Sequence, residues 1–499
     1  MAVFKGFVGG SYSLPSRIAA SDECINWYPE RIEAQNEKSD MILVGTPGLK
    51  VFCTLPTSPV QGVYEVLARV FAVAGGVLYE ISANGAYKSR GNLGVSGAGT
   101  AIFTSNNVEL VVAIAGTLNA WALTLASNIL TPISDAMRAA GIIAVGSLAY
   151  IDGYVIASSV GTRRFYLSTL YDATSWPGLY FASKEGGADN LVALVANQRV
   201  LYLLGAETSE AWWDAGPANF PFAYIQGSFM EKGCAAALSP AQFDNTVAWL
   251  GRDNRGQGVV YRANGYTPKR ISTHAIESAI GGYPSISDAI GSTHQYRGHE
   301  FYRLDFPSAK PAPPNGTSAG ATWLYDAATG LWHERAFWQS ITPRFEGHRG
   351  RYYCSGFGLH LVGDYASGAV YQMDAQYLTD FGNPLRSLRT APHQFTEGNW
   401  QFFNWYRFDL QVGAGTTGIG AGQTPGVAPA FAILQVSNDG GNTWSNERYQ
   451  SMGSIGRYKR SVIFRRTGRA RDRVVRLVIS DPVSRVLVGA FYDSTEGLP

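Results

Sequence analysis

The stretch RVFAVAGGVLYEI, from Arg69 to Ile81, carries the pattern that decides the fold. A short apolar strand is followed by a Gly turn and then by a second strand that contains an aromatic residue. Related stretches begin at Glu109, Gly153, Arg199, Thr246, His299 and Arg351. A recurrence of this kind outweighs any single motif, because a repeat sets the architecture of the whole chain.

The apolar residues that open these repeats are separated by 40 to 54 residues. They fall near Val70, Leu110, Tyr154, Val200, Val247, Phe301 and Tyr352. A four-stranded propeller blade repeats at about 40 to 50 residues, whereas helical repeats would show a period of about 3.6 residues. The spacing predicts an all-β fold with a β-propeller of seven blades. Six or eight blades are close alternatives, and a large irregular β-sandwich is the competing architecture.

The strand pattern divides the chain into three parts. The propeller is expected over residues 51–395, with a Pro-rich surface insertion at 307–320. Longer strands then predict a β-sandwich-like domain over 396–499, with an uncharged, Gly-rich loop at 412–430. Residues 1–50 resemble a loop-rich segment, and we expect this segment to pack with the C-terminal domain.

The composition agrees with many short strands joined by tight turns. The 499 residues include 57 glycines, 13% aromatic residues and 16% charged residues, whereas typical proteins have about 7% Gly and about 25% charge. An apolar fraction of 46% excludes disorder. The chain has 40 basic and 38 acidic residues, and the resulting net charge of +2 does not indicate a nucleic-acid or membrane binder.

One uncharged stretch, from Leu110 to Ser134, is long enough for the roughly 20 residues of a membrane span. It contains polar residues and a turn-like AGTLN that divides it into two apolar pieces. We therefore expect a buried β-hairpin here and no insertion into a cellular membrane.

The sequence offers no catalytic, cofactor or metal-binding pattern. The seven histidines include neither an HxH pair nor an HExxH motif. The GxGxxG match from Gly413 to Gly418 is followed by more Gly and Pro, without the helix that would hold a pyrophosphate. No CxxC pair occurs, so we expect buried, reduced thiols at Cys24, Cys53, Cys234 and Cys354. We predict a protein that is not an enzyme and needs no cofactor or metal.

The octapeptide SNDGGNTW, from Ser437 to Trp444, fits the S-x-D-x-G-x-T-W Asp box of sialidases and other β-propellers. In such a turn the Asp accepts backbone amides, the Gly residues allow positive φ and the Trp packs underneath. A sialidase would also need an arginine cluster and a tyrosine nucleophile beside an acid. We interpret the motif as a stabilised turn formed by Ser437, Asp439, Gly441, Thr443 and Trp444.

The segment from Arg457 to Arg485 has ten basic and two acidic residues, so it carries +8 and leaves −6 for the remainder. Strand alternation would place several of these side chains on exposed faces, where they could meet phosphates or an acidic protein surface. A solvated face is the alternative, and contact between neighbouring subunits is as plausible as contact with DNA. The candidate contact residues are Arg457, Lys459, Arg460, Arg465, Arg466, Arg469, Arg471, Arg473 and Arg476.

Both ends of the chain resemble one protein family. The stretch from Gln435 to Val483 resembles the end of the packaged-DNA stabilisation proteins, the tail nozzle or hub family of P22-like short-tailed phages. The segments CINWYPE, from Cys24 to Glu30, and VGTPGLKVF, from Val44 to Phe52, resemble N-terminal segments of that family. The middle matches only through its propeller-like repeat.

This resemblance implies a structural virion protein of the phage tail that has no catalytic residues. A homo-hexameric ring would lie below the portal and its adaptor protein, continue the channel for double-stranded DNA and retain the packaged genome until ejection. Tail needle and fibre or spike proteins are further expected partners. The resemblance does not say whether the basic run meets adaptor, neighbouring subunit or DNA. A receptor-binding or glycan-hydrolysing, sialidase-like tail protein and a cellular propeller scaffold that binds peptides are the alternatives. Ring formation with a portal adaptor would separate the nozzle protein from both.

Overall fold

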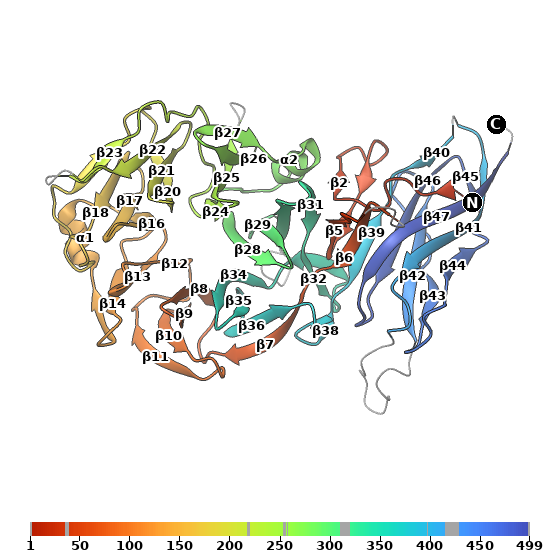
Figure 1. The fold of residues 1–499 in the computed structure, drawn as a ribbon, viewed down its shortest axis with the longest axis horizontal. Helices are drawn as coiled ribbons and strands as arrows, with labels where there is room; N and C mark the ends of the chain where they lie inside the picture. The colour runs from red at the N-terminus through yellow and green to blue at the C-terminus, as the bar shows by residue number, and fades with distance from the viewer. Residues whose placement is uncertain are drawn as a thin grey trace.

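The computed structural model describes residues 2–34, 39–216, 220–252, 256, 258–309, 320–396, 398–414 and 429–497. These residues form a ring of four-stranded sheets and, beside it, a β-sandwich (Figure 1). Two helices occur within these ranges, α1 (Ser134–Ala140) and α2 (His274–Gly281). Most of the insertions expected at 307–320 and 412–430 lies outside the described residues.

The described strands of the ring form seven four-stranded units, as the repeat predicts. The first three blades are β8 (Val60–Val66), β9 (Arg69–Ala74), β10 (Val77–Ile81) and β11 (Tyr87–Asn92); β12 (Ala101–Ser105), β13 (Glu109–Ile114), β14 (Ala120–Thr124) and β15 (Ile129–Pro132); and β16 (Val145–Ile151), β17 (Tyr154–Ser159), β18 (Arg164–Leu167) and β19 (Phe181–Ser183). The next three are β20 (Leu191–Asn197), β21 (Val200–Gly205), β22 (Ser209–Asp214) and β23 (Phe222–Tyr224); β24 (Ala241–Phe243), β25 (Thr246–Arg252), β26 (Gly258–Asn264) and β27 (Thr267–Arg270); and β28 (Ile290–Tyr296), β29 (His299–Phe306), β30 (Ala321–Asp326) and β31 (Trp332–Glu334).

The seventh blade closes the ring with a strand from the N-terminal part of the chain. It contains β34 (Gly350–Gly356), β35 (Leu359–Asp364), β36 (Ala369–Asp374) and β7 (Gly48–Thr54). The outermost strand, β7, pairs antiparallel with β36. Main-chain hydrogen bonds therefore fasten the two ends of the propeller together. Because β7 crosses the boundary expected at residue 50, the propeller includes residues from Gly48.

The first strand of every blade lies innermost, and neighbouring inner strands contact each other around the whole ring (Figure 1). In six blades a two-residue turn with positive φ at both positions joins the first strand to the second. These turns are Leu67–Ala68, Asp152–Gly153, Gln198–Arg199, Asp244–Asn245, Arg297–Gly298 and Phe357–Gly358. Such turns match the right-handed twist of a hairpin.

One of the seven apolar residues that mark the repeats lies in a different strand of its blade from the other six. Six of them, from Val70 to Phe301, lie in the second strand of their blades, whereas Tyr352 lies in β34, the first strand of the seventh. The equivalent strand is β35. The strands β34 and β35 are both short and rich in apolar and aromatic residues, so the linear pattern does not distinguish their positions.

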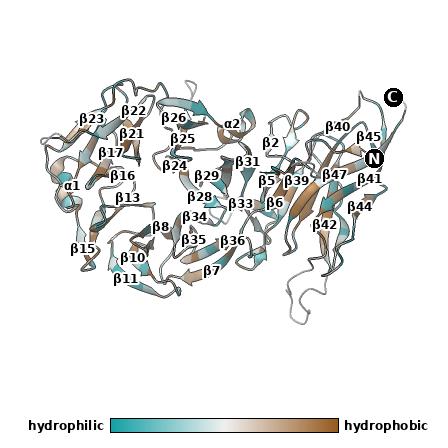
Figure 2. Cartoon of the chain, in the orientation of Figure 1, coloured by the Kyte–Doolittle hydropathy of each residue, from teal (hydrophilic) through white to brown (hydrophobic). Residues whose placement is uncertain are grey.

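Apolar side chains fill the spaces between consecutive blades, and Figure 2 shows hydrophobic residues along the strands of both parts. Val70 and Leu361, for example, belong to one buried cluster that joins the first and seventh blades. The uncharged stretch from Leu110 to Ser134 forms β13, β14 and β15. Its apolar residues thus pack within the ring.

The sandwich consists of two sheets that enclose a core with Phe7, Trp27 and Tyr406. The first contains β44 (Val462–Arg465), β41 (Gln401–Leu410), β47 (Val486–Glu496), β6 (Met41–Gly45) and β5 (Trp27–Arg31), with β1 (Ala2–Val3) and β45 (Arg469–Ala470) beside them. The second contains β4 (Cys24–Ile25), β39 (Ser387–Thr390), β46 (Asp472–Ile479), β42 (Ala430–Ser437) and β43 (Arg448–Gly453), with β40 (Gln394–Phe395) beside β46. N-terminal strands thus contribute to both sheets, and β39 and β40, inside the range 51–395, pair with the sandwich.

A continuous sheet joins the two parts, because β4 pairs with β31 of the sixth blade and with β39 of the sandwich. Asn26 lies at this joint with a φ of 56°, and its Nδ2 donates to the carbonyls of Ala336 (2.9 Å) and Arg386 (2.7 Å). Its Oδ1 accepts from Arg335, which also pairs with Asp380 (2.6 Å). The remaining short strands are β2 (Tyr12–Ser13), β3 (Ser21–Asp22), β32 (Ala336–Gln339), β33 (Arg344–Gly347), β37 (Thr379–Asp380) and β38 (Asn383–Pro384).

Candidate functional site

The structure separates the basic run of the sandwich into two exposed groups and one internal pair. The first group, Arg457, Lys459 and Arg460, lies in the turn between β43 and β44 and is here called the turn surface. The second group, Arg465, Arg466, Arg469 and Arg471, lies near the beginning of β41 and, with Trp400 and Phe402, is called the arginine–aromatic surface. The internal pair is Arg473 and Arg476.

The turn surface lies at the end of the sandwich where β41 ends and β42 begins (Figure 1). Its three basic side chains line a hollow of about 730 Å³ together with Tyr458, which is 72% exposed. The Arg460 Nε donates to the carbonyl of Ser451 (2.9 Å). The turn is therefore tied to β43, and the other two cations extend into solvent.

The arginine–aromatic surface is built around Trp400. The guanidinium carbons of Arg469 and Arg471 lie 4.6 and 5.1 Å from the centre of its ring. Arg465, Arg466 and Arg469 also line a hollow of about 620 Å³ with Phe402, a phenylalanine that is 43% exposed. Arginine and large aromatic residues carry much of the binding energy in protein interfaces, so this surface has the composition of a protein contact.

Arg473 is not available to a partner, so its predicted contact role is wrong, whereas Arg476 is half-buried and its contact role stays a prediction. Arg473 is 1% exposed and donates to Asn438 Oδ1 (3.0 Å) and to the carbonyl of Thr467 (2.8 Å). Arg476 bonds Glu23 (3.1 Å). Burial lowers the pKa of both guanidiniums. Both residues lie on β46, which has neighbours on each side, and strand alternation in the sequence does not reveal that central position.

The Asp box forms the turn after β42. Asp439 accepts from the amides of Asn442 (3.0 Å) and Thr443 (2.9 Å), and the Gly441 amide donates to Ser437 Oγ (2.8 Å). Hydrogen bonds from the Ser437 and Thr443 hydroxyls hold the pKa of Asp439 well below its usual value. Arg476 lies 3.7 Å from the centre of the Trp444 ring. These contacts all serve the turn, which agrees with a structural role.

A group of buried histidines between the sixth and seventh blades was not anticipated. His294 and His333 line a small cavity of about 20 Å³ with His348, Tyr28 and Arg303. Burial lowers the pKa of His294 and of His333 to about 3, and it holds the pKa of His348 well below its usual value. The three histidines share no sequence motif, and the folding of the sixth blade and of the residues that follow it brings them together.

Within the described ranges, no group of three or more His, Cys, Asp or Glu side chains could hold a metal ion. All four cysteines are buried and unpaired, and burial raises the pKa of Cys24, Cys53 and Cys234 to about 11. No helix in the described part of the chain is long and apolar enough to span a membrane.

A seven-bladed propeller joined by a continuous sheet to a sandwich with exposed basic and aromatic surfaces belongs to the class of structural proteins that assemble with other proteins. More specifically, the chain belongs to the Bacteriophage P22 Gp10 family. The family's β-propeller matches residues 24–377 and its β-sandwich matches residues 389–493. The protein is thus a structural component of a phage tail, of the tail nozzle or DNA-stabilisation type, and the family resemblance of the two chain ends is confirmed.

The solved structures that match this chain share little sequence with it. The N-terminal domain of Nup159 has 10% identity and a TM-score of 0.41, and the match covers 71% of this chain and 99% of that domain. Virginiamycin B lyase from Staphylococcus aureus has 9% identity and a TM-score of 0.40, with 70% and 99% covered. The computationally designed Ika8 protein has 10% identity and a TM-score of 0.37, with 65% and 99% covered. No curated protein matches the chain.

Proposed function

We propose that this chain is the repeated subunit of a homo-hexameric nozzle ring below the portal and its adaptor. The ring continues the channel for double-stranded DNA, retains the packaged genome until ejection and has no catalytic role. The observation that carries the proposal is the presence of both family domains, joined by one continuous sheet. A subunit whose parts are joined by main-chain and buried side-chain hydrogen bonds suits the wall of a channel under pressure.

Ring assembly is assigned to the arginine–aromatic surface. Its four arginines form no ion pair with a carboxylate among the described residues, so an acidic protein surface would complement them. The exposed ring of Phe402 and the half-buried ring of Trp400 favour a protein partner over a phosphate backbone, because burial of their apolar surface on binding is favourable. The partner is the adaptor or a neighbouring subunit.

The turn surface is separate from this contact. It lies beyond the end of β41, and the ten residues of that strand span about 33 Å at ~3.3 Å per residue. A compact partner on one surface therefore leaves the other surface available. Tail needle and fibre or spike proteins are proposed to join the ring in the complete tail.

Phage particles made without this protein test the function. We expect heads that package DNA and then lose it, with tails that end below the adaptor in electron micrographs. Full heads with complete tails that fail to attach to cells would contradict the proposal and favour a receptor-binding role.

Purified components test the assigned surface. The variant R465A/R466A/R469A/R471A should fail to form rings on the purified adaptor, as measured by mass photometry, while R457A/K459A/R460A, with the turn surface removed, should form them. Equal assembly by both variants would show that the arginine–aromatic surface is not the assembly contact.

A further inference from the structure

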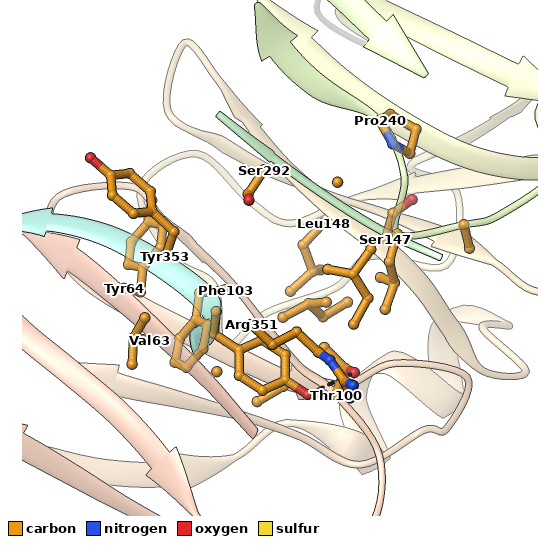
Figure 3. A pocket seen from close by; sticks show the side chains of 18 of the residues that line it. Val63, Tyr64, Thr100, Phe103, Ser147, Leu148, Pro240, Ser292, Arg351 and Tyr353 are labelled. Carbon is orange, nitrogen blue, oxygen red and sulfur yellow. Dashed lines mark hydrogen bonds between the residues drawn. The ribbon is translucent and has the colours of Figure 1, made fainter. Parts of the chain in front are cut away.

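The innermost strands of the propeller surround a hollow of about 260 Å³ (Figure 3). Every blade contributes to its wall, through the first strand or the residues directly before it. Gly291 shows how closely the strands approach, since a Cβ there would lie 1.9 Å from the carbonyl oxygen of Ser239. The hollow is thus a feature of the closed ring rather than of one blade.

Arg351 is the single charged residue among those that line this hollow. Its guanidinium carbon lies 4.1 Å from the centre of the Tyr365 ring, which fixes its orientation. Its Nε is buried without a hydrogen-bond partner in the described part of the chain, and no described carboxylate forms an ion pair with it. The nearby Arg349 differs, because it donates two hydrogen bonds to Asp364 (3.1 and 2.9 Å).

A second polar group in the same hollow also lacks a partner. Ser292, on the innermost strand of the sixth blade, has a buried Oγ without a hydrogen bond to any described residue. Thr100 and Tyr352 add two hydroxyl groups, which lie 3.4 Å apart. Figure 3 shows Arg351 and Thr100 on one side of the hollow and Ser292 across from them. Buried polar groups are normally paired, so a hollow that is lined by two residues with an unpaired buried polar atom points to a ligand.

We propose that this hollow is a binding site for a small oxyanion, either inorganic phosphate or a carboxylate. The guanidinium of Arg351 supplies the charge and a fork of donors that matches such an anion. The hydroxyls of Ser292 and Thr100 donate the remaining hydrogen bonds. No acidic side chain lines the hollow to repel the anion. At about 30 Å³ of liquid volume per water, the space holds an oxyanion together with a few waters.

Titration of the full-length protein by calorimetry with inorganic phosphate, and separately with acetate, tests the site at constant ionic strength. The expected result is saturable binding at one site per chain. The affinity for the anion should fall at least tenfold in Arg351→Gln and several-fold in Ser292→Ala. The control is Arg297→Gln, because Arg297 is an exposed arginine that also lies over a tyrosine ring, 5.5 Å from the centre of Tyr296, but outside the hollow.

Binding of phosphate alone would identify a phosphate site, and binding of acetate alone a carboxylate site; both outcomes support the proposal. Thermal unfolding of each variant shows whether it folds, and Ser292→Ala carries the test if Arg351→Gln does not. Unchanged affinity in the folded variants, or no saturable binding of either anion, would overturn it. Because the readout is anion binding by the isolated protein, it is independent of ring assembly.

Discussion

Acid should weaken the propeller through the buried histidines between its sixth and seventh blades. His294 and His333 have a pKa of about 3 in the folded protein, because burial disfavours their charged forms. A histidine in the unfolded chain has a pKa of about 6.5. Between these values the unfolded chain binds more protons than the folded protein does. The stabilising effect is therefore complete above about pH 6.5 and is lost as the pH falls toward 3.

The expected size follows from the two pKa values. At pH 5 the pH is about 1.5 units below the pKa of an unfolded histidine. Each of these units lowers the free energy of unfolding by about 1.4 kcal/mol. Each of the two histidines then lowers the free energy of unfolding by about 2 kcal/mol, and together they lower it by about 4 kcal/mol. Whole domains are stable by about 5–15 kcal/mol, so this loss is large. His299 acts in the opposite direction, because its hydrogen bond to Asp326 (2.9 Å) raises its pKa.

The assay is urea unfolding at about pH 7.5 and about pH 5, followed by tryptophan fluorescence. In His333→Gln the difference between the two pH values should shrink by about 2 kcal/mol, because the variant keeps a polar side chain but does not titrate. His274→Gln is the control, since the His274 side chain on α2 is 76% exposed. If the wild type and His333→Gln lost the same stability between the two pH values, buried neutral His333 would not be the cause.

Three further predictions concern the ring closure, the joint and the Asp box. Gly48→Ala should weaken the pairing of β7, because a Cβ would lie 2.3 Å from the carbonyl oxygen of Tyr377. Limited proteolysis should then cut near residue 54 faster than in Gly281→Ala, where the space is open and φ is not positive. Asn26→Ala should cost more than about 2 kcal/mol in urea unfolding, since it leaves the Ala336 amide and the Arg386 carbonyl without their side-chain partner, and a loss below 1 kcal/mol would contradict this. Asp439→Ala should speed amide hydrogen exchange at Asn442 and Thr443 with little change elsewhere. In the wild type the protection of these two amides should be lost as acid protonates Asp439, whose pKa is lowered. Unaltered exchange in Asp439→Ala would exclude the turn role.

The regular features of the fold could be predicted from the sequence. Strands of alternating pattern at nearly constant spacing determine a propeller, because each blade repeats the same local contacts. The turns inside the blades were less visible. Only three of the six turns with two positive φ values contain a glycine, and pairs such as Leu67–Ala68 and Gln198–Arg199 give no compositional signal.

Features that depend on distant pairing could not be predicted. Nothing in the local pattern of β7 indicates that its partner is β36, and nothing near Arg473 indicates a central strand. The same holds for Ser292 and Arg351, which face one hollow only after the ring has closed. The basic run was visible in the sequence, but its division into two surfaces and an internal pair depends on how the sandwich strands are ordered.

The pairing of β7 with β36 also sets an order on biosynthesis. The two strands are 315 residues apart in the chain, and at about 5–20 residues per second the ribosome needs ~15–60 s to make that interval. During this time β7 is an unpaired strand edge, which other chains can bind. A nascent chain that is released early has no seventh blade to receive β7, so it exposes this edge to proteases and to aggregation. The propeller can therefore close only after translation has passed residue 374, the last residue of β36.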